Sequence, residues 1–384
     1  MRTTTTGPLR VLDTTLREGE QFAQAHFTTE DRLRLARALD AFGVDEIELP
    51  SPAVSPAAAA DVAAVLGLGL RAAVRVHLRC SPADVEAALA CGARGVNLFL
   101  GASPALGAHS LRESPRERRD RVRTAVALAA QAGAFVRFSA EDAFRTPRRD
   151  LLQLCDVAVE AGAQRLGVPD TVGTATPEAV AATVGALRRR YPGISQEFHG
   201  HNDTGCAVAN AVAAWRAGAD CLDVTVLGIG ERVGITSLGG LMARLYTFDP
   251  GLVARYHLER LPALDATVAA LVGVAVPFNQ PLTGPHAFTH VAGVHSNAVL
   301  RAPHTYEAVD PAVVGRRRVV SVTSRLTGRH AVAHFATELL GRPVDAEEAR
   351  AATAALKATA ERRRIGPDAA ADIVRAALGA APGA

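Results

Sequence analysis

Two histidines separated by a single glycine mark the segment of this sequence with the clearest chemical meaning, FHGHND at residues 198–203. Residues two apart on a strand point to the same side, so the imidazoles of His199 and His201 can act on one ion. A carboxylate from another strand would complete a two-histidine, one-carboxylate site, which suits a divalent metal with open positions for substrate and water. Glu18 is our candidate for this third ligand. The alternative, two histidines buried for packing, is weaker because Gly200 leaves room beside them.

Other polar residues stand where predicted strands end. Arg17 directly precedes Glu18 and could stabilise an oxyanion, although neighbouring Arg and Glu residues also form ordinary surface ion pairs. His77 ends a further strand. Arg137 and Ser139 alternate along another strand, so they share a face and could clamp a carboxylate. Taken alone, His77 could equally be a packing histidine and Arg137 a structural ion-pair partner, and both alternatives stay open here.

These residues lie in a unit that recurs along the chain. A helix–glycine–strand junction reads AFGVDEIEL at 41–49, ACGARGVNL at 90–98, EAGAQRLGV at 160–168 and RAGADCLDV at 216–224. Each glycine stands where a helix must end, at a position that favours a left-handed backbone. The apolar runs predict eight strands, at 9–13, 45–49, 73–78, 95–100, 135–140, 164–168, 196–200 and 221–226.

Strands that alternate with helices predict a parallel sheet with right-handed crossovers. Eight such units in about 240 residues fit a closed (β/α)₈ TIM barrel, in which active-site groups stand at the C-terminal ends of the strands. An open doubly wound sheet is the alternative. It would be favoured by a GxGxxG turn after the first strand, but residues 14–20 read TTLREGE.

The alternation stops near residue 250. Pro277, Pro281 and Pro285 then mark turn-rich segments, and an alanine-rich helical tail begins at Asp345. We therefore predict an α/β protein with a catalytic (β/α)₈ barrel at residues 8–255. Residues 256–384 would form a linker and a smaller, mainly helical C-terminal region.

Composition argues against several other classes of protein. The 384 residues are 48% hydrophobic and 21% charged, with a net charge of +3, which is ordinary for a globular protein. The arginine runs at 188–190 and 316–318 are short and come without a nucleic-acid-binding motif, so we expect no nucleic-acid partner.

Five cysteines without a CxxC pair argue against disulfides or structural zinc and favour a reducing compartment. The polar segment 1–10 lacks the apolar core of a signal peptide, and no apolar stretch could span a bilayer, so we expect a cytoplasmic protein without a membrane role.

Six segments together resemble the homocitrate synthases of lysine biosynthesis, which belong to a wider group with isopropylmalate synthase and hydroxymethylglutaryl-CoA lyase. The segments are LDTTLREGEQF at 12–22, RFSAED at 137–142, DTVG at 170–173, EFHGHNDTGC at 197–206, LGIGER at 227–232 and SRLTGRH at 324–330. The resemblance implies an acyltransferase that condenses acetyl-CoA, its co-substrate, with 2-oxoglutarate to give homocitrate. It also implies a divalent metal, which could be Mg, Mn, Zn or Co, and a homodimer.

The resemblance also implies a role for each matching residue. Glu18, His199 and His201 would bind the metal, and Arg17 would contact the 2-oxo group. His295, with Glu141 and Tyr306, would transfer protons and would reach the site from the partner subunit through the C-terminal region; spacing alone gives no such role. The pocket for the oxo acid would be lined by Gln21, His77, Arg137, Ser139 and Thr171.

Three other functions are compatible with the sequence. The same condensation could use another acidic 2-oxo acid, either oxaloacetate, giving citrate, or phosphonopyruvate, giving 2-phosphonomethylmalate. A metal-dependent carbon–carbon lyase would share the barrel and the metal. A metabolite-sensing protein on an inactive scaffold is the weakest interpretation, because Glu18, His199 and His201 are all present.

Overall fold

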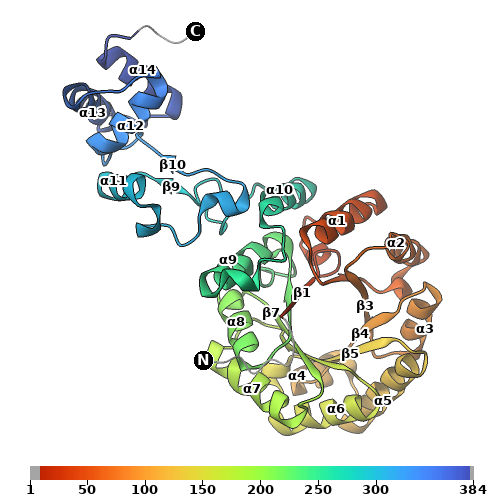
Figure 1. Cartoon of the computed structure of the whole chain (residues 1–384). Helices are drawn as coiled ribbons and strands as arrows, with labels where there is room; N and C mark the ends of the chain where they lie inside the picture. The colour runs from red at the N-terminus through yellow and green to blue at the C-terminus, as the bar shows by residue number, and fades with distance from the viewer. Residues whose placement is uncertain (1–8, 381–384) are drawn as a thin grey trace. The chain divides into compact units, whose positions relative to one another are not determined.

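Eight parallel strands close into a barrel in the computed structural model, which describes residues 9–380 (Figure 1). Each strand pairs with the next one along the chain, and β8 pairs with β1, where Leu12 lies opposite Asp223. The strands are β1 (Arg10–Asp13), β2 (Glu46–Leu49), β3 (Ala73–Arg79), β4 (Gly95–Gly101), β5 (Phe135–Glu141), β6 (Arg165–Asp170), β7 (Ser195–Gly200) and β8 (Cys221–Val224). The predicted (β/α)₈ barrel is confirmed; residue 8, its predicted start, lies outside the described residues.

Helices follow the strands and surround the barrel (Figure 1). The first of them begins at a capping box, in which Thr28 and Asp31 bind each other's backbone amides. The glycines of all four repeated junctions have the positive φ predicted for them. The helices are α1 (Thr29–Phe42), α2 (Pro56–Leu66), α3 (Pro82–Ala90), α4 (Pro104–Leu106), α5 (Pro115–Gln131), α6 (Arg148–Glu160), α7 (Pro177–Arg190), α8 (Ala207–Ala217), α9 (Leu238–Phe248) and α10 (Leu261–Leu271).

The strands begin and end within two residues of the predicted positions, and two differences from the sequence prediction have a structural cause. The first compact unit extends to Val276, whereas we predicted the end of the barrel at residue 255. The difference is due to α10, which contacts α1 and buries Leu261 and Val268, although no strand follows it to continue the repeat. The last strand of the barrel ends at Val224 and not at 226, because a 3₁₀ helix begins at Val226, in which Leu227 has a φ of 61°.

Charged side chains line the interior of the barrel, where branched aliphatic residues are usual. Alternate residues of each strand point inward, which brings Glu46, Arg75, Arg165 and Glu197 into one layer. The Nη atoms of the fully buried Arg165 lie 2.6 Å from Glu46 Oε1 and 2.8 Å from Glu197 Oε2. Arg75 donates to Glu46 over 2.6 Å, and its guanidinium occupies the space that a side chain at Gly95 would need. The layer is therefore a network of buried ion pairs, which Glu197 continues to Arg137.

Replacing Arg165 by leucine is expected to lower the free energy of unfolding by about 3–5 kcal/mol, because Glu46 and Glu197 would remain buried without their shared cation. The matched control is Arg190→Leu, which removes an exposed partner of Asp156. Its expected loss is below about 1 kcal/mol. Urea unfolding of both variants measures the difference, and equal losses would contradict the prediction.

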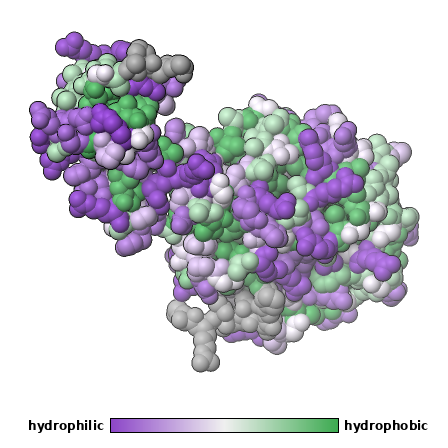
Figure 2. Space-filling view, turned by 45° about the horizontal axis from the view of Figure 1, so that its top comes forward, coloured by the Kyte–Doolittle hydropathy of each residue, from purple (hydrophilic) through white to green (hydrophobic). Residues whose placement is uncertain are grey.

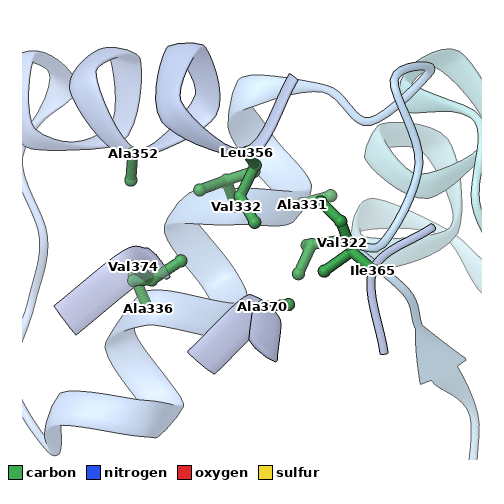
Figure 3. Close-up of a cluster of buried hydrophobic side chains, with 9 residues drawn as sticks. All are labelled: Val322, Ala331, Val332, Ala336, Ala352, Leu356, Ile365, Ala370 and Val374. Atoms are coloured by element: carbon green, nitrogen blue, oxygen red, sulfur yellow. The ribbon is translucent and has the colours of Figure 1, made fainter. Parts of the chain in front are cut away.

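From Pro277 to the last described residue, 380, the chain forms a second compact unit. It contains the short strands β9 (Thr289–His290) and β10 (Val319–Val320), which pair in parallel. Its core lies among the last three helices, where Val332, Leu356 and Val374 are buried (Figure 3). The helices are α11 (Gly293–Arg301), α12 (Arg329–Leu340), α13 (Ala346–Ala360) and α14 (Pro367–Ala377).

Hydrophilic and hydrophobic side chains are interspersed over the face of the molecule seen in Figure 2. In the second unit, Val294, Tyr306 and Leu326 are large apolar side chains that are 76%, 48% and 62% exposed. Along residues 9–380, no helix combines the length and the apolar composition needed to cross a membrane.

Candidate active site

One cavity of about 210 Å³ gathers the predicted site residues of the barrel. All but Arg137, the third residue of β5, come from the C-terminal end of a strand or from the loop after it, as expected for such a barrel. The predicted residues that line it are Arg17, Glu18, Gln21, His77, Arg137, Ser139, Glu141, Thr171, His199 and His201; Phe99, Pro169, Glu231 and Arg232 complete the wall. Sequence reasoning therefore identified most of this cavity.

Glu18, His199 and His201 offer three ligand atoms that all lie within 4.8 Å of one another. His199 Nδ1 lies 3.0 Å from Asp223 Oδ2, so that carboxylate holds the ring and leaves Nε2 for a ligand, as is usual for metal-binding histidines. Burial lowers the pKa of both imidazoles to about 4, so both are neutral at pH 7, the form that binds metals.

The donor set fits a divalent cation. Two neutral imidazoles and one carboxylate leave coordination positions for substrate and water. His201 Nδ1 is buried with no hydrogen-bond partner, which is costly for a side chain that only fills space. Burial raises the pKa of Glu18, but the charge of Arg17 and the hydrogen bond from the Glu231 amide lower it, and the net effect is a lowered pKa, so this carboxyl group is ionised.

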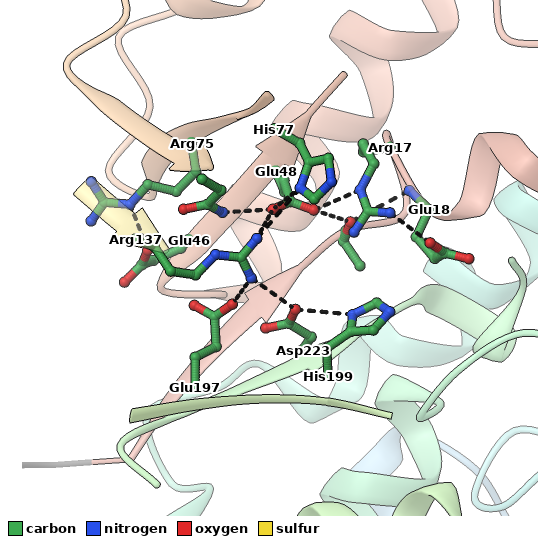
Figure 4. Close-up of polar contacts among 12 residues, drawn as sticks. Arg17, Glu18, Glu46, Glu48, Arg75, His77, Arg137, Glu197, His199 and Asp223 are labelled. Atoms are coloured by element: carbon green, nitrogen blue, oxygen red, sulfur yellow. Dashed lines mark hydrogen bonds and ion pairs between the residues drawn. The ribbon is translucent and has the colours of Figure 1, made fainter. Parts of the chain in front are cut away.

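Glu48 organises the centre of the cavity without lining it. Its Oε2 accepts from Arg17 Nε over 2.7 Å and from Thr14 Oγ1 over 2.8 Å. Its Oε1 accepts from Asn97 Nδ2 over 2.6 Å and from Arg137 Nη2 over 3.1 Å, and His77 Nδ1 lies 3.3 Å away (Figure 4). Burial opposes ionisation, but Arg17 and the other partners hold the pKa of Glu48 well below its usual range. One carboxylate therefore holds Arg17, Arg137 and His77 in place.

Arg137 is more strongly engaged than its sequence position suggested. Figure 4 shows its guanidinium among Glu48, Glu197 and Asp223. The side chain is only 2% exposed, and both terminal nitrogens form ion pairs. Both interpretations of this residue therefore apply, because Arg137 is a structural ion-pair partner that also forms part of the cavity wall.

Smaller contacts fix the remaining wall residues. The hydroxyl of Ser139 occupies the space beside Gly167, where any side chain would collide with it. Thr171 Oγ1 accepts from the amide of Asp142 over 2.9 Å. Burial, together with the charge of Asp142, raises the pKa of Glu141, so this carboxyl group accepts a proton more readily than an exposed one.

His295 and Tyr306, the two other predicted site residues, belong to the second unit. Their ring centroids are 4.3 Å apart. His295 lies in the first turn of α11, and Tyr306 follows a short 3₁₀ helix. The two rings therefore form one exposed pair, and their part in catalysis stays a prediction.

Sequence reasoning missed the carboxylate of Asp223, which supports His199, and the backbone amide of Glu231, which donates to Glu18 Oε1 over 2.8 Å. The alternation of β8 could have identified Asp223, because Cys221 and Asp223 must face the same way as the inward residues of β7. The contact of the Glu231 amide could not be predicted from the sequence, because it is made by the backbone and does not depend on the type of side chain.

Comparisons with known proteins agree with this geometry. Residues 8–268 match the HMGL-like family, and residues 282–364 match the homocitrate synthase post-HMGL domain-like family. The chain is 43% identical to the mitochondrial homocitrate synthase of Penicillium rubens, over 96% of this chain and 77% of that protein. It is also 43% identical to the cytosolic isozyme of homocitrate synthase from Saccharomyces cerevisiae, over 84% of this chain and 76% of that protein. Among solved structures, the HMG-CoA lyase of Bacillus subtilis shares the fold, with a TM-score of 0.64 and 21% identity over 72% of this chain and 97% of that one.

The closed barrel, the Glu–His–His cluster at its mouth and the match over residues 8–268 define an enzyme of the HMGL-like class. Both named homocitrate synthases exceed 40% identity over most of this chain, and the second unit carries the domain that follows the barrel in them. The chain belongs to the homocitrate synthase family, which confirms the resemblance seen in the sequence.

Proposed function

We propose that this protein condenses acetyl-CoA with 2-oxoglutarate and, with one water, releases homocitrate and CoA. The observation that carries the proposal is the cavity, in which the Glu–His–His cluster, Arg17 and a polar wall of His77, Ser139 and Arg137 lie together. The close relatives named homocitrate synthase support it.

The chain's own residues have distinct tasks in this reaction. Arg17 is held by Glu48 and Glu18, so its charge has a fixed position beside the reacting carbonyl, whose oxygen becomes negative as the new bond forms. Ser139 and Thr171 would bind the distal carboxylate of the oxo acid. His77 is neutral, because burial and Arg17 lower its pKa to about 4, so it adds no charge to that end of the cavity.

Glu18, His199 and His201 would hold the divalent metal. When bound there, such an ion polarises the carbonyl of the oxo acid. The donor set accepts Mg, Mn, Zn or Co, so the identity of the metal is left open by its ligands.

His295 would remove a proton from the acetyl methyl group, with Glu141 and Tyr306 beside it. We propose that it acts from the partner subunit of a homodimer. The exposed apolar side chains around it, Val294 and Leu326, support an interface there, since such side chains are usually covered. A cytoplasmic location also stays a prediction; the relatives named above include one mitochondrial and one cytosolic protein.

Release of free CoA thiol tests the proposal directly. The purified protein is given acetyl-CoA, a divalent metal and, one at a time, 2-oxoglutarate, oxaloacetate, phosphonopyruvate, 2-oxoisovalerate or pyruvate. We expect 2-oxoglutarate to give the highest kcat/KM and homocitrate as the product by mass spectrometry. Release with a different acceptor only would reject the substrate, and no release with any acceptor would reject the reaction.

A further inference from the structure

We propose that Arg232 is a positioning residue for the metal site, because it holds the loop after β8 in the shape that supports Glu18 and His201. The inference rests on the proposed function, since it takes these two residues as metal ligands. Arg232 acts on them through the backbone of its own loop.

Arg232 ties three active-site loops together. Its Nε and Nη2 lie 2.8 and 2.9 Å from the two carboxylate oxygens of Asp203, in the loop after β7. Its Nη2 also donates over 2.8 Å to the carbonyl oxygen of Thr171, in the loop after β6. A planar guanidinium suits this two-pronged contact, which a lysine could not reproduce.

The loop that carries Arg232 has an unusual backbone. Arg232 has a φ of 57° and Leu227 a φ of 61°, values that residues other than glycine rarely adopt. Gly234 also has positive φ, and any side chain there would collide with the carbonyl of Gly228. Such conformations persist only where surrounding contacts hold them, and the ion pair of Arg232 with Asp203 is one contact that holds this loop.

This backbone contacts two of the three candidate ligands. The amide of Glu231 donates to Glu18 Oε1 over 2.8 Å, and Gly230 lies so close that a Cβ there would stand 2.7 Å from the same oxygen. Farther along, Ile235 forms a β-bridge with His201. If the loop relaxes, the carboxylate of Glu18 loses the hydrogen bond from the Glu231 amide. The backbone of His201 loses its bridge to Ile235. The cation would then bind less tightly, because such supporting contacts set metal affinity.

Arg232 also lines the cavity, so a direct contact with the oxo acid is the competing explanation. The two explanations differ in what excess metal does. Weak metal binding is overcome by a high metal concentration, whereas a lost substrate contact keeps the KM for 2-oxoglutarate high at any metal concentration.

The test is a titration of the metal-free full-length protein with Co²⁺, followed by the visible absorption of the bound ion. We expect Arg232→Gln to weaken Co²⁺ binding by about 10-fold or more. The matched control is Arg190→Gln, because Arg190 forms a similar two-pronged pair with Asp156 far from the cavity. Its affinity should equal that of the wild type. CoA release by Arg232→Gln should return toward the wild-type rate at saturating metal.

Two results would overturn the inference: an unchanged Co²⁺ affinity in Arg232→Gln, or a KM for 2-oxoglutarate that stays high at saturating metal. Should Arg232→Gln fail to fold, Asp203→Asn removes the same ion pair from the other side and is read in the same way. A wild-type protein that binds no Co²⁺ would instead reject the metal site in the proposed function. The CoA-release assay on wild type keeps the two failures apart.

Discussion

His201→Ala is expected to reduce CoA release by about 1000-fold, because the loss of a metal ligand removes several kcal/mol of stabilisation from the developing charge. The variant is informative because the substitution breaks no hydrogen bond of the His201 ring: Nδ1 has no partner, and Nε2 lies 4.0 Å from Glu18 Oε1. Thermal unfolding should therefore change far less than activity does. The measurements are the rate of thiol release and the metal content of the purified variant.

The matched control is His257→Ala, which removes an exposed imidazole that pairs with Glu259 outside the cavity. It should retain wild-type activity and metal content. If His201→Ala were fully active, His201 would not be a metal ligand. The proposed site of Glu18, His199 and His201 would then be contradicted.

His295→Ala is expected to bind 2-oxoglutarate as the wild type does but to release CoA about 10²–10⁴-fold more slowly, the range typical of a lost general acid or base. Oxo-acid binding should persist because His295 lies in the second unit, whereas the polar wall for the acid lies in the barrel. Calorimetry measures binding, and a thiol reagent measures release. His334→Ala, which alters a half-exposed imidazole of α12, is the control.

Mixing the two inactive variants tests whether the site is shared between subunits. If His295 acts on the partner's barrel, a dimer of one His201→Ala and one His295→Ala chain contains one site with neither change. Random exchange of subunits should then restore about a quarter of the wild-type activity, because half of the dimers are mixed and each has one intact site. A mixture that stays inactive after exchange would place His295 in the site of its own chain.

The sequence predicted the structure best where a regular strand or helix determines which way its side chains point or where the element ends. The spacing of His199 and His201 predicted two imidazoles on one side of a strand, and the repeated glycine junctions predicted the eight units of the barrel. Both follow from local geometry, since the period of a strand and the end of a helix depend on neighbouring residues only.

Contacts between distant strands were less predictable. Arg137 appears in the sequence as one polar residue on a strand, and only the closed barrel shows that Glu48 and Glu197 surround it. The extent of α10 was missed for a similar reason, because a helix without a following strand gives no signal of where it packs. Partners 60 or 89 residues apart cannot be paired without the order of the strands.

The position of Arg137 also limits how the enzyme could be redesigned to accept a different acid. An engineer would first replace this arginine, since it faces the cavity and carries a charge. Its removal would take one buried cation away from both carboxylates, leaving Glu48 paired with Arg17 alone and Glu197 paired with Arg165 alone, and Glu48 is the residue that orients Arg17. Selection libraries for new acceptors should therefore keep Arg137 constant and vary Gln21, Ser139 and Thr171, whose side chains form no part of the buried ion pairs.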